Sequence, residues 1–150
     1  MPNELSYKLL VRPGSSSGSA STAARTSADF QIDGESLLRI LVQKDGGHSD
    51  FMGAFVQGFP DSQANAAKQM RLQAESSMSS GRVLLYMCPE CGDIGCGAYS
   101  AKIARDHGTY TWSDFAYENG YEDPRPLEGI GPFVFSSSQY EAAIASASAL

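Results

Sequence analysis

Residues 82–116 read RVLLYMCPECGDIGCGAYSAKIARDHGTYTWSDFA, and their hydrophobic pattern changes along this length. Residues 83–88 form a continuous apolar run of the kind found in central strands. Residues 98–103 and 109–115 each have a strand-like pattern, and residues 105–108 between them are typical of a turn. We therefore predict a three-stranded antiparallel meander over about 82–116, whose first connection carries every cysteine of the chain.

Weaker patterns predict the elements around this meander. They rest on the spacing of apolar residues and on turn and cap residues. In chain order we expect a strand at 5–12, a helix at 35–43, a strand or close-packed loop at 52–59, a surface helix entered at 60–62 and continuing to 75, a strand at 133–135, and an alanine-rich helix opened by a capping box at 138–141. The expected fold class is α+β, a largely antiparallel sheet with helices packed on one face.

The length of 150 residues fits a single domain, 1–150, that is long enough to bury a core without help from a metal or a disulfide. A glycine- and serine-rich stretch begins at Pro13. Such a composition does not bury enough apolar surface to order itself. We therefore expect a flexible segment over about 13–28.

The three cysteines, Cys88, Cys91 and Cys96, have the spacing C-x2-C-x4-C. In a C-x-x-C turn both thiolates face one point, and the glycines that follow allow positive φ angles. Zinc prefers four nitrogen or sulfur ligands in a tetrahedral arrangement. We expect these cysteines to supply three ligands of a structural zinc site. The simpler alternative is a tight turn with three reduced cysteines.

The fourth zinc ligand must come from elsewhere in the chain. We predict His48, because Gly46 and Gly47 allow its segment to fold over the cysteine turn. His107 belongs to the next predicted turn, which would place it at the opposite end of the meander from the thiols. Asp93 lies inside the cysteine turn, where its carboxylate can instead cap backbone amides.

A thiol-dependent redox protein, or a zinc enzyme that uses Cys88, Cys91 and Cys96 directly, is the alternative function. A zinc enzyme needs an open metal position and a neighbouring acid or base, for which Glu90 and Asp50 are the candidates. A redox role would use Cys96 as a resolving thiol. The glycines around the cysteines disfavour the helix that zinc-deaminase and thioredoxin-like motifs open, so both of those motifs are excluded.

The net charge of −6 is concentrated near the C-terminus, since residues 111–150 hold six acids and one base. This charge disfavours binding to a nucleic-acid backbone and suits a basic protein partner, although solubility alone explains it as well. No apolar run approaches the ~20 residues that span a membrane, and the N-terminus lacks a signal peptide. With an odd number of cysteines, these features lead us to expect a cytoplasmic protein with reduced thiols.

Residues 112–123 interleave aromatic and acidic side chains. The favoured interpretation is a strand end, with Phe115 and Tyr117 feeding the core and Trp112 covering the other face. The alternative is an exposed aromatic and acidic patch that binds a protein.

Four short motifs carry a resemblance to a known family. They are C-x-x-C-G-D-x-G-C-G at 88–97, W-x-D-F at 112–115, E-N-x-Y at 118–121 and Gly-Pro-Phe at 131–133. From about Phe30 to Ile144 the chain resembles a family of small uncharacterised bacterial proteins, whose members are sometimes labelled oxidoreductases. The resemblance implies a shared fold and a recurring thiol turn, with no substrate to carry over. We therefore expect a zinc-binding domain that acts by protein interaction.

Overall fold

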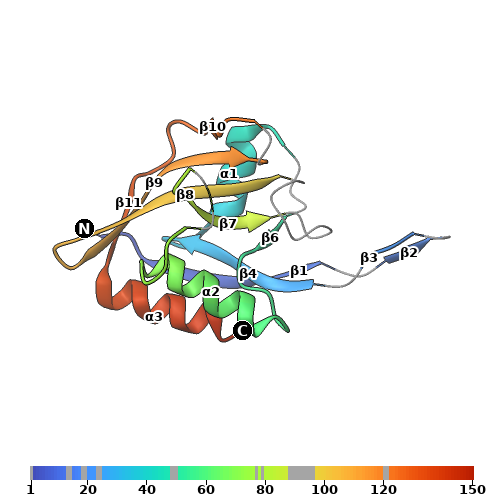
Figure 1. Cartoon of the computed structure of the whole chain (residues 1–150), viewed down its shortest axis with the longest axis horizontal. Helices are drawn as coiled ribbons and strands as arrows, with labels where there is room; N and C mark the ends of the chain where they lie inside the picture. Colours follow the sequence, from blue (N-terminus) through green and yellow to red (C-terminus); the bar gives the residue numbers. More distant parts are fainter. Residues whose placement is uncertain are drawn as a thin grey trace.

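The structure is a computed structural model that describes residues 2–12, 15–17, 20–22, 25–47, 51–76, 78, 80–87, 97–119 and 122–150. Figure 1 shows the elements of these residues. In chain order they are β1 (Leu5–Arg12), β2 (Ser15–Ser17), β3 (Ala20–Thr22), β4 (Arg25–Ile32), β5 (Glu35–Ser36), α1 (Leu37–Asp45), β6 (Met52–Gly53), α2 (Pro60–Met70), β7 (Val83–Met87), β8 (Ala98–Asp106), β9 (Thr109–Glu118), β10 (Arg125–Pro126), β11 (Phe133–Ser136) and α3 (Ser137–Ser148).

The largest sheet has the strand order β10-β9-β8-β7-β6, with β11 also paired to β9, and every pair in it is antiparallel. The consecutive strands β7, β8 and β9 are the predicted meander. Their hairpin turns at His107 and Gly108, where both residues have positive φ. The predicted α+β class and the antiparallel meander are therefore confirmed.

Hydrogen bonds join this sheet to a second one, which has the order β1-β4-β5. The chain after β6 bonds to β4, through Ala28 N to Phe55 O at 3.0 Å and Gln57 N to Thr26 O at 2.8 Å. On the other side, Asn3 N donates to Val134 O at 2.6 Å, so the start of the chain reaches β11. The two sheets consequently enclose one core.

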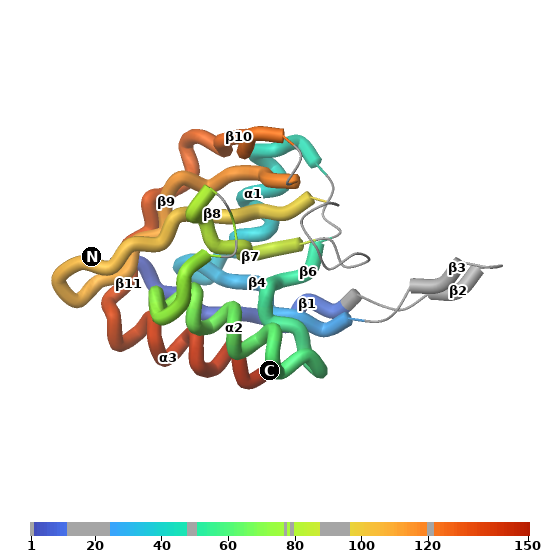
Figure 2. The backbone as a smooth tube through the Cα atoms, viewed as in Figure 1, coloured from blue at the N-terminus to red at the C-terminus, as the bar shows by residue number. Residues whose placement is uncertain are grey.

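The helices cover this core from two places (Figure 2). Helices α2 and α3 lie side by side and bury Met70 and Tyr140. Helix α1 lies apart from them, packs against β4 and buries Leu37, Leu38 and Leu41. Its N-cap is Ser36, whose hydroxyl accepts from Arg39 N, as expected for a serine at this position. No helix in the described part of the chain is long and apolar enough to span a bilayer.

Trp112 is the centre of the core and has no exposed surface. Its ring meets Phe30 edge-on at 5.3 Å and Phe135 at 5.4 Å. Its indole N–H donates to Tyr140 Oη at 3.1 Å, and that hydroxyl donates to Met70 O at 2.6 Å. Buried tryptophan and tyrosine need such partners for their polar atoms. Trp112, expected to cover the other face of the strand, therefore lies inside the core instead.

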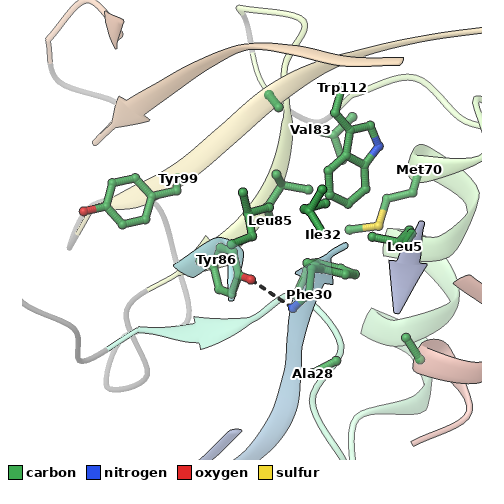
Figure 3. Close-up of a cluster of buried hydrophobic side chains, with 14 of the residues drawn as sticks. Leu5, Ala28, Phe30, Ile32, Met70, Val83, Leu85, Tyr86, Tyr99 and Trp112 are labelled. Atoms are coloured by element: carbon green, nitrogen blue, oxygen red, sulfur yellow. Dashed lines mark hydrogen bonds between the residues drawn. The ribbon is translucent and has the colours of Figure 1, made fainter. Parts of the chain in front are cut away.

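A buried polar network crosses from β7 to β4. The Tyr86 hydroxyl accepts from Phe30 N at 3.0 Å, the dashed line in Figure 3, and donates to Asp29 Oδ1 at 2.7 Å. Ser36 Oγ donates to the other oxygen of Asp29 at 2.7 Å. Burial, followed by the charge of Asp29, raises the pKa of Tyr86 well above its ordinary value. Tyr86 therefore remains a hydrogen-bond donor that ties the two sheets together.

Three predicted boundaries need correction. The segment expected to be flexible up to residue 28 includes the start of an ordered strand, because β4 begins at Arg25 and buries Ala28. Helix α2 ends at Met70, since Leu72 has a left-handed φ of 59° that stops it. The last helix has Ser136 as its N-cap, without a side-chain cap, and Glu141 accepts from Tyr110 Oη at 3.1 Å. The predicted capping box at 138–141 is therefore wrong.

Candidate functional site

All four predicted zinc ligands, Cys88, Cys91, Cys96 and His48, lie outside the described residues. The same is true of the further candidates Asp50, Glu90 and Asp93. The geometry of the site must therefore be built from the residues that precede and follow these two segments.

The residues around the cysteine segment lie at one end of the main sheet. Met87, which precedes Cys88, pairs with Ala98 on β8 and with Met52 on β6. Ala98 in turn pairs with Glu118 on β9. The chain thus enters and leaves the cysteine segment at two adjacent positions of the sheet. Figure 2 shows this end opposite the β8–β9 turn.

The residues around His48 contact the same end of the sheet through Tyr99. A Cβ on Gly47, which precedes His48, would lie 3.5 Å from Tyr99 Oη. The ring of Phe51, which follows the segment 48–50, lies 4.8 Å from the Tyr99 ring. Tyr99 is on β8 and has no exposed surface. The buried Tyr99 side chain therefore lies close to Gly47 and packs against Phe51, the described residues on either side of the segment 48–50.

Four side chains, which we call the sheet-end cluster, surround this point: Asp45, Tyr99, Tyr117 and Arg125. Asp45 is the last residue of α1, and its side chain is only 6% exposed. Tyr99 Oη donates to Asp45 Oδ2 at 3.0 Å, and Arg125 forms an ion pair with Asp45 Oδ1. The Arg125 guanidinium also lies over the Tyr117 ring, 4.8 Å from its centroid. The cluster thereby joins α1, β8, β9 and β10.

The sheet-end cluster has the chemistry of a structural support. Burial, followed by the hydrogen bond and charge of Asp45, raises the pKa of Tyr99 well above its ordinary value. Tyr99 therefore keeps its proton and remains a donor at neutral pH. Asp45 is engaged by both Tyr99 and Arg125, so its carboxylate is occupied. Neither group is placed to act as a general base.

Two glycines allow the backbone to approach this cluster closely. Gly97 follows Cys96 and has a φ of 101°, and a Cβ there would collide with the Tyr117 hydroxyl. A Cβ on Gly47 would lie 3.0 Å from Asp45 Oδ2. Gly97 needs glycine both for space and for its backbone angle, whereas a Cβ on Gly47 would only require the Asp45 carboxylate to shift by a few tenths of an ångström.

His107 is placed as predicted, at the opposite end of the meander from Met87 and Ala98 (Figure 1). Its side chain is 94% exposed, and its Nε2 lies 3.2 Å from Asp106 Oδ1. Strand β8 runs from Ala98 to Asp106, so roughly 25 Å of extended chain separate this turn from the cysteine end. His107 therefore lies far from Met87 and Ala98, the described residues nearest to the cysteine segment in the sheet.

Glu118 is a further buried carboxylate at the cysteine end, paired with Ala98. It accepts from Ser100 Oγ in β8 and from Ser80 Oγ at 3.1 Å. Ser80 belongs to the chain between α2 and β7, so Glu118 fastens that chain to the sheet. Within the described residues, no three histidine, cysteine, aspartate or glutamate side chains gather closely enough to hold a metal ion.

The aromatic and acidic segment supplies core residues and one surface of charge. Phe115 is 1% exposed, so its expected place in the core is confirmed, whereas Trp112, which was expected to cover the other face, is fully buried as well. Neither ring belongs to an exposed aromatic patch. The acids of this segment differ in solvent exposure: Glu118 is buried, whereas Asp114, Glu122 and Asp123 are exposed.

Sequence reasoning missed the sheet-end cluster. Asp45 appeared only as the end of a helix, and Tyr99 only as a strand residue. The glycines could have pointed to this cluster, since Gly46 and Gly47 follow Asp45 directly and Gly97 precedes Tyr99 by two residues. Glycine beside a buried polar or aromatic residue often marks a close backbone approach. The partner Arg125 lies 80 residues from Asp45, and no local pattern connects them.

Comparisons of the chain with models of protein families, with curated proteins and with solved structures find no match to any of the three.

Proposed function

We propose that the protein binds one structural zinc ion at the cysteine end of its main sheet, through Cys88, Cys91, Cys96 and His48, and acts by contact with another protein. The observation that carries this proposal is the position of Tyr99. Its ring contacts Phe51, and its hydroxyl would lie 3.5 Å from a Cβ on Gly47, so it lies close to both sides of the segment 48–50.

The proposal also rests on the covalent bonds that join the predicted ligands to residues at this end of the sheet. His48 is bonded to Gly47, Cys96 to Gly97 and Cys88 to Met87. Consecutive Cα atoms are 3.8 Å apart, so each of these predicted ligands begins one Cα step from a residue at this end of the sheet. Met87 and Ala98 are paired neighbours there. The fold thus supports a site shared by His48 and the cysteines, while the exposed His107 has no access to it.

The protein-contact part of the proposal rests on charge. Four of the acids in residues 111–150 are exposed: Asp114, Glu122, Asp123 and Glu128. Arg125, the base of this region, is held by Asp45. A basic protein suits these exposed carboxylates, of which Asp114 lies 3.9 Å from Lys102 Nζ, and its binding would weaken as the salt concentration rises.

The zinc proposal is tested by metal analysis of protein purified without a chelator. We expect one zinc per chain and no thiol that reacts before unfolding. Cys91→Ser and His48→Asn should each weaken zinc binding by more than about 100-fold. Changing a residue that only hydrogen-bonds to a metal ligand weakens binding by up to about 100-fold, and removing a ligand should cost more. Metal-free protein with a rapidly reacting thiol of low pKa would overturn the proposal and favour thiol chemistry instead.

A further inference from the structure

Strand β1 is a long edge strand with few of the features that usually protect an edge. It stands at one end of the order β1-β4-β5 and, among the described strands, pairs only with β4. The other strands that end the two larger sheets, β5, β6 and β10, have two residues each, whereas β1 has eight. Its register with β4 contains no bulge, and its sequence contains no proline. Short length, bulges and prolines protect sheet edges from pairing, so the edge of β1 is open to a further strand.

The backbone groups on this edge belong to alternate residues of β1. In an antiparallel pair, every second residue bonds to the partner strand and the others point away from it. Leu5 points away from β4, because the Gln139 side chain bonds to both its N–H, at 3.0 Å, and its C=O. The next outward residues are therefore Tyr7, Leu9 and Val11. Within the described chain, no group forms a hydrogen bond with the N–H or C=O of these three residues.

Two of these three residues carry the most exposed large hydrophobic side chains of the described chain. Leu9 is 60% exposed and Val11 is 64% exposed. They lie on the same face of β1 as the buried Leu5, since alternate side chains point to one face of a sheet. Figure 2 shows β1 and β4 extending beyond the C-terminal end of α3. Helix α3 therefore covers the start of β1 and leaves its end uncovered.

The charge of β1 favours an acidic partner. The strand contains two bases, Lys8 and Arg12, and no acid. Lys8 is exposed, and the carboxylate of Asp29, which stands opposite on β4, is bound by Tyr86 and Ser36 instead. Lys8 forms no ion pair with another described residue. An acidic side chain opposite Lys8 on an added strand would stabilise the pairing, whereas a second copy of β1 would bring two further bases and no acid.

We infer that the open edge of β1 binds an extended acidic segment of another protein, which adds an antiparallel strand to the sheet. Its backbone bonds to Tyr7, Leu9 and Val11, apolar side chains at alternate positions cover Leu9 and Val11, and an acid between them faces Lys8. Backbone bonds supply affinity in this mode of binding, and the alternate side chains supply specificity. The surface is separate from the exposed acids of residues 111–150, and the inference does not rest on the zinc site.

The test uses the acetylated and amidated peptide Val-Thr-Val-Glu-Val. In the inferred register its residues lie, in order, opposite Val11, Leu10, Leu9, Lys8 and Tyr7. Binding to the full chain is followed by NMR of the isotope-labelled protein. We expect the amide signals of Tyr7, Leu9 and Val11 to move as their N–H groups gain an acceptor. The peptide Val-Thr-Val-Lys-Val should bind about threefold more weakly, the size of effect expected for one exposed ion pair.

Two N-methylated forms of the first peptide, equal in composition, are the matched controls. A methyl group on the nitrogen of the central valine removes the N–H that donates to Leu9 O. A methyl group on the nitrogen of the glutamate removes an N–H that points away from β1. We expect the first form to cause no shift at Leu9 and the second to bind as the unmodified peptide does.

Two variants test the protein side of the interface. The N–H of Leu9 points away from β4, so Leu9→Pro removes an outward donor without removing a bond of the β1–β4 ladder. It should abolish the shift at Val11 while the dispersion of the other signals shows a folded chain. Lys8→Glu leaves the backbone unchanged, so it serves even where Leu9→Pro fails to fold, and it should reverse the preference between the glutamate and lysine peptides.

Three results would overturn the inference. The first is the absence of any shift at Leu9 and Val11 with millimolar peptide. The second is equal binding of the two N-methylated forms, since it would show that the backbone of β1 takes no part. The third is a dimer of the full chain in sedimentation equilibrium that Leu9→Pro dissociates, because the edge would then belong to a second copy of the chain.

Discussion

The two ends of the β8–β9 hairpin belong to the same pair of strands, but different interactions stabilise them. At the turn, His107 is 94% exposed, and no other described atom lies within 4 Å of the place where a Cβ on Gly108 would stand. At the open end, Tyr99 is fully buried and Gly97 is pressed against Tyr117. The turn is set by local backbone chemistry, whereas the open end is set by side chains from α1 and β10.

Because of this difference, side chains distant along the chain hold the backbone at the open end and not at the turn. In the Asp45–Arg125 ion pair the carboxylate is buried, whereas the arginine side chain is 55% exposed. The buried carboxylate depends on this partner, because an uncompensated buried charge is costly. Such an arrangement resists movement of the chain that it holds. The exposed Asp106–His107 contact is screened by solvent and holds little.

The largest expected effect is on the free energy of unfolding, and it appears when Gly97→Ala is compared with Gly108→Ala. Both glycines have a positive φ, 101° and 79°, so both variants carry the cost of a left-handed alanine, about 1 kcal/mol. Gly97→Ala also drives a methyl group into the Tyr117 hydroxyl, which adds about 2 kcal/mol of overpacking. Urea unfolding should show a total loss of about 3 kcal/mol for Gly97→Ala and about 1 kcal/mol for Gly108→Ala.

Equal losses in the two variants would contradict the contrast between the ends. They would show that Tyr117 moves aside freely and that the sheet-end cluster does not hold the backbone at Gly97.

The turn end was predictable from the sequence and the cysteine end was not. The strand pattern of 98–103 and 109–115 and the glycine at 108 act over a few residues, so they placed the hairpin and put His107 in its turn. The contacts of Tyr99 depend on Asp45 and Arg125, which are distant along the chain, and periodicity carries no information about such pairs. The long apolar run of β7 likewise predicted a central strand, but not the hydrogen bonds that join it to β4.

The second-largest expected effect is the loss of unfolding free energy at alkaline pH, and it is compared between Tyr99 and Tyr110. Both have a pKa raised by burial, and the increase is larger for Tyr99. The unfolded chain ionises these tyrosines near pH 10, before the folded chain does, so stability is complete below pH 10 and falls as the pH rises above it. We expect Tyr99 to account for a loss of about 1 kcal/mol between pH 10 and 11.

Unfolding by urea at pH 9, 10 and 11 measures this slope. Tyr99→Phe should flatten it, and Tyr110→Phe should flatten it less. A Tyr99→Phe slope identical to that of the wild type would mean that the Tyr99 hydroxyl already ionises in the folded protein.

The smallest expected effect is that of His107→Asn, and it compares the only two histidines of the chain. Asparagine tolerates the left-handed backbone of this position, where φ is 45°, and the side chain is almost wholly exposed. The free energy of unfolding should change by less than about 0.5 kcal/mol, and the zinc content should stay at one per chain. Since His48→Asn makes the same chemical change at the other end, the pair isolates position as the cause. If His107→Asn lost as much zinc as His48→Asn, the turn would have to reach the metal. That would require a hairpin that does not extend away from the cysteine end.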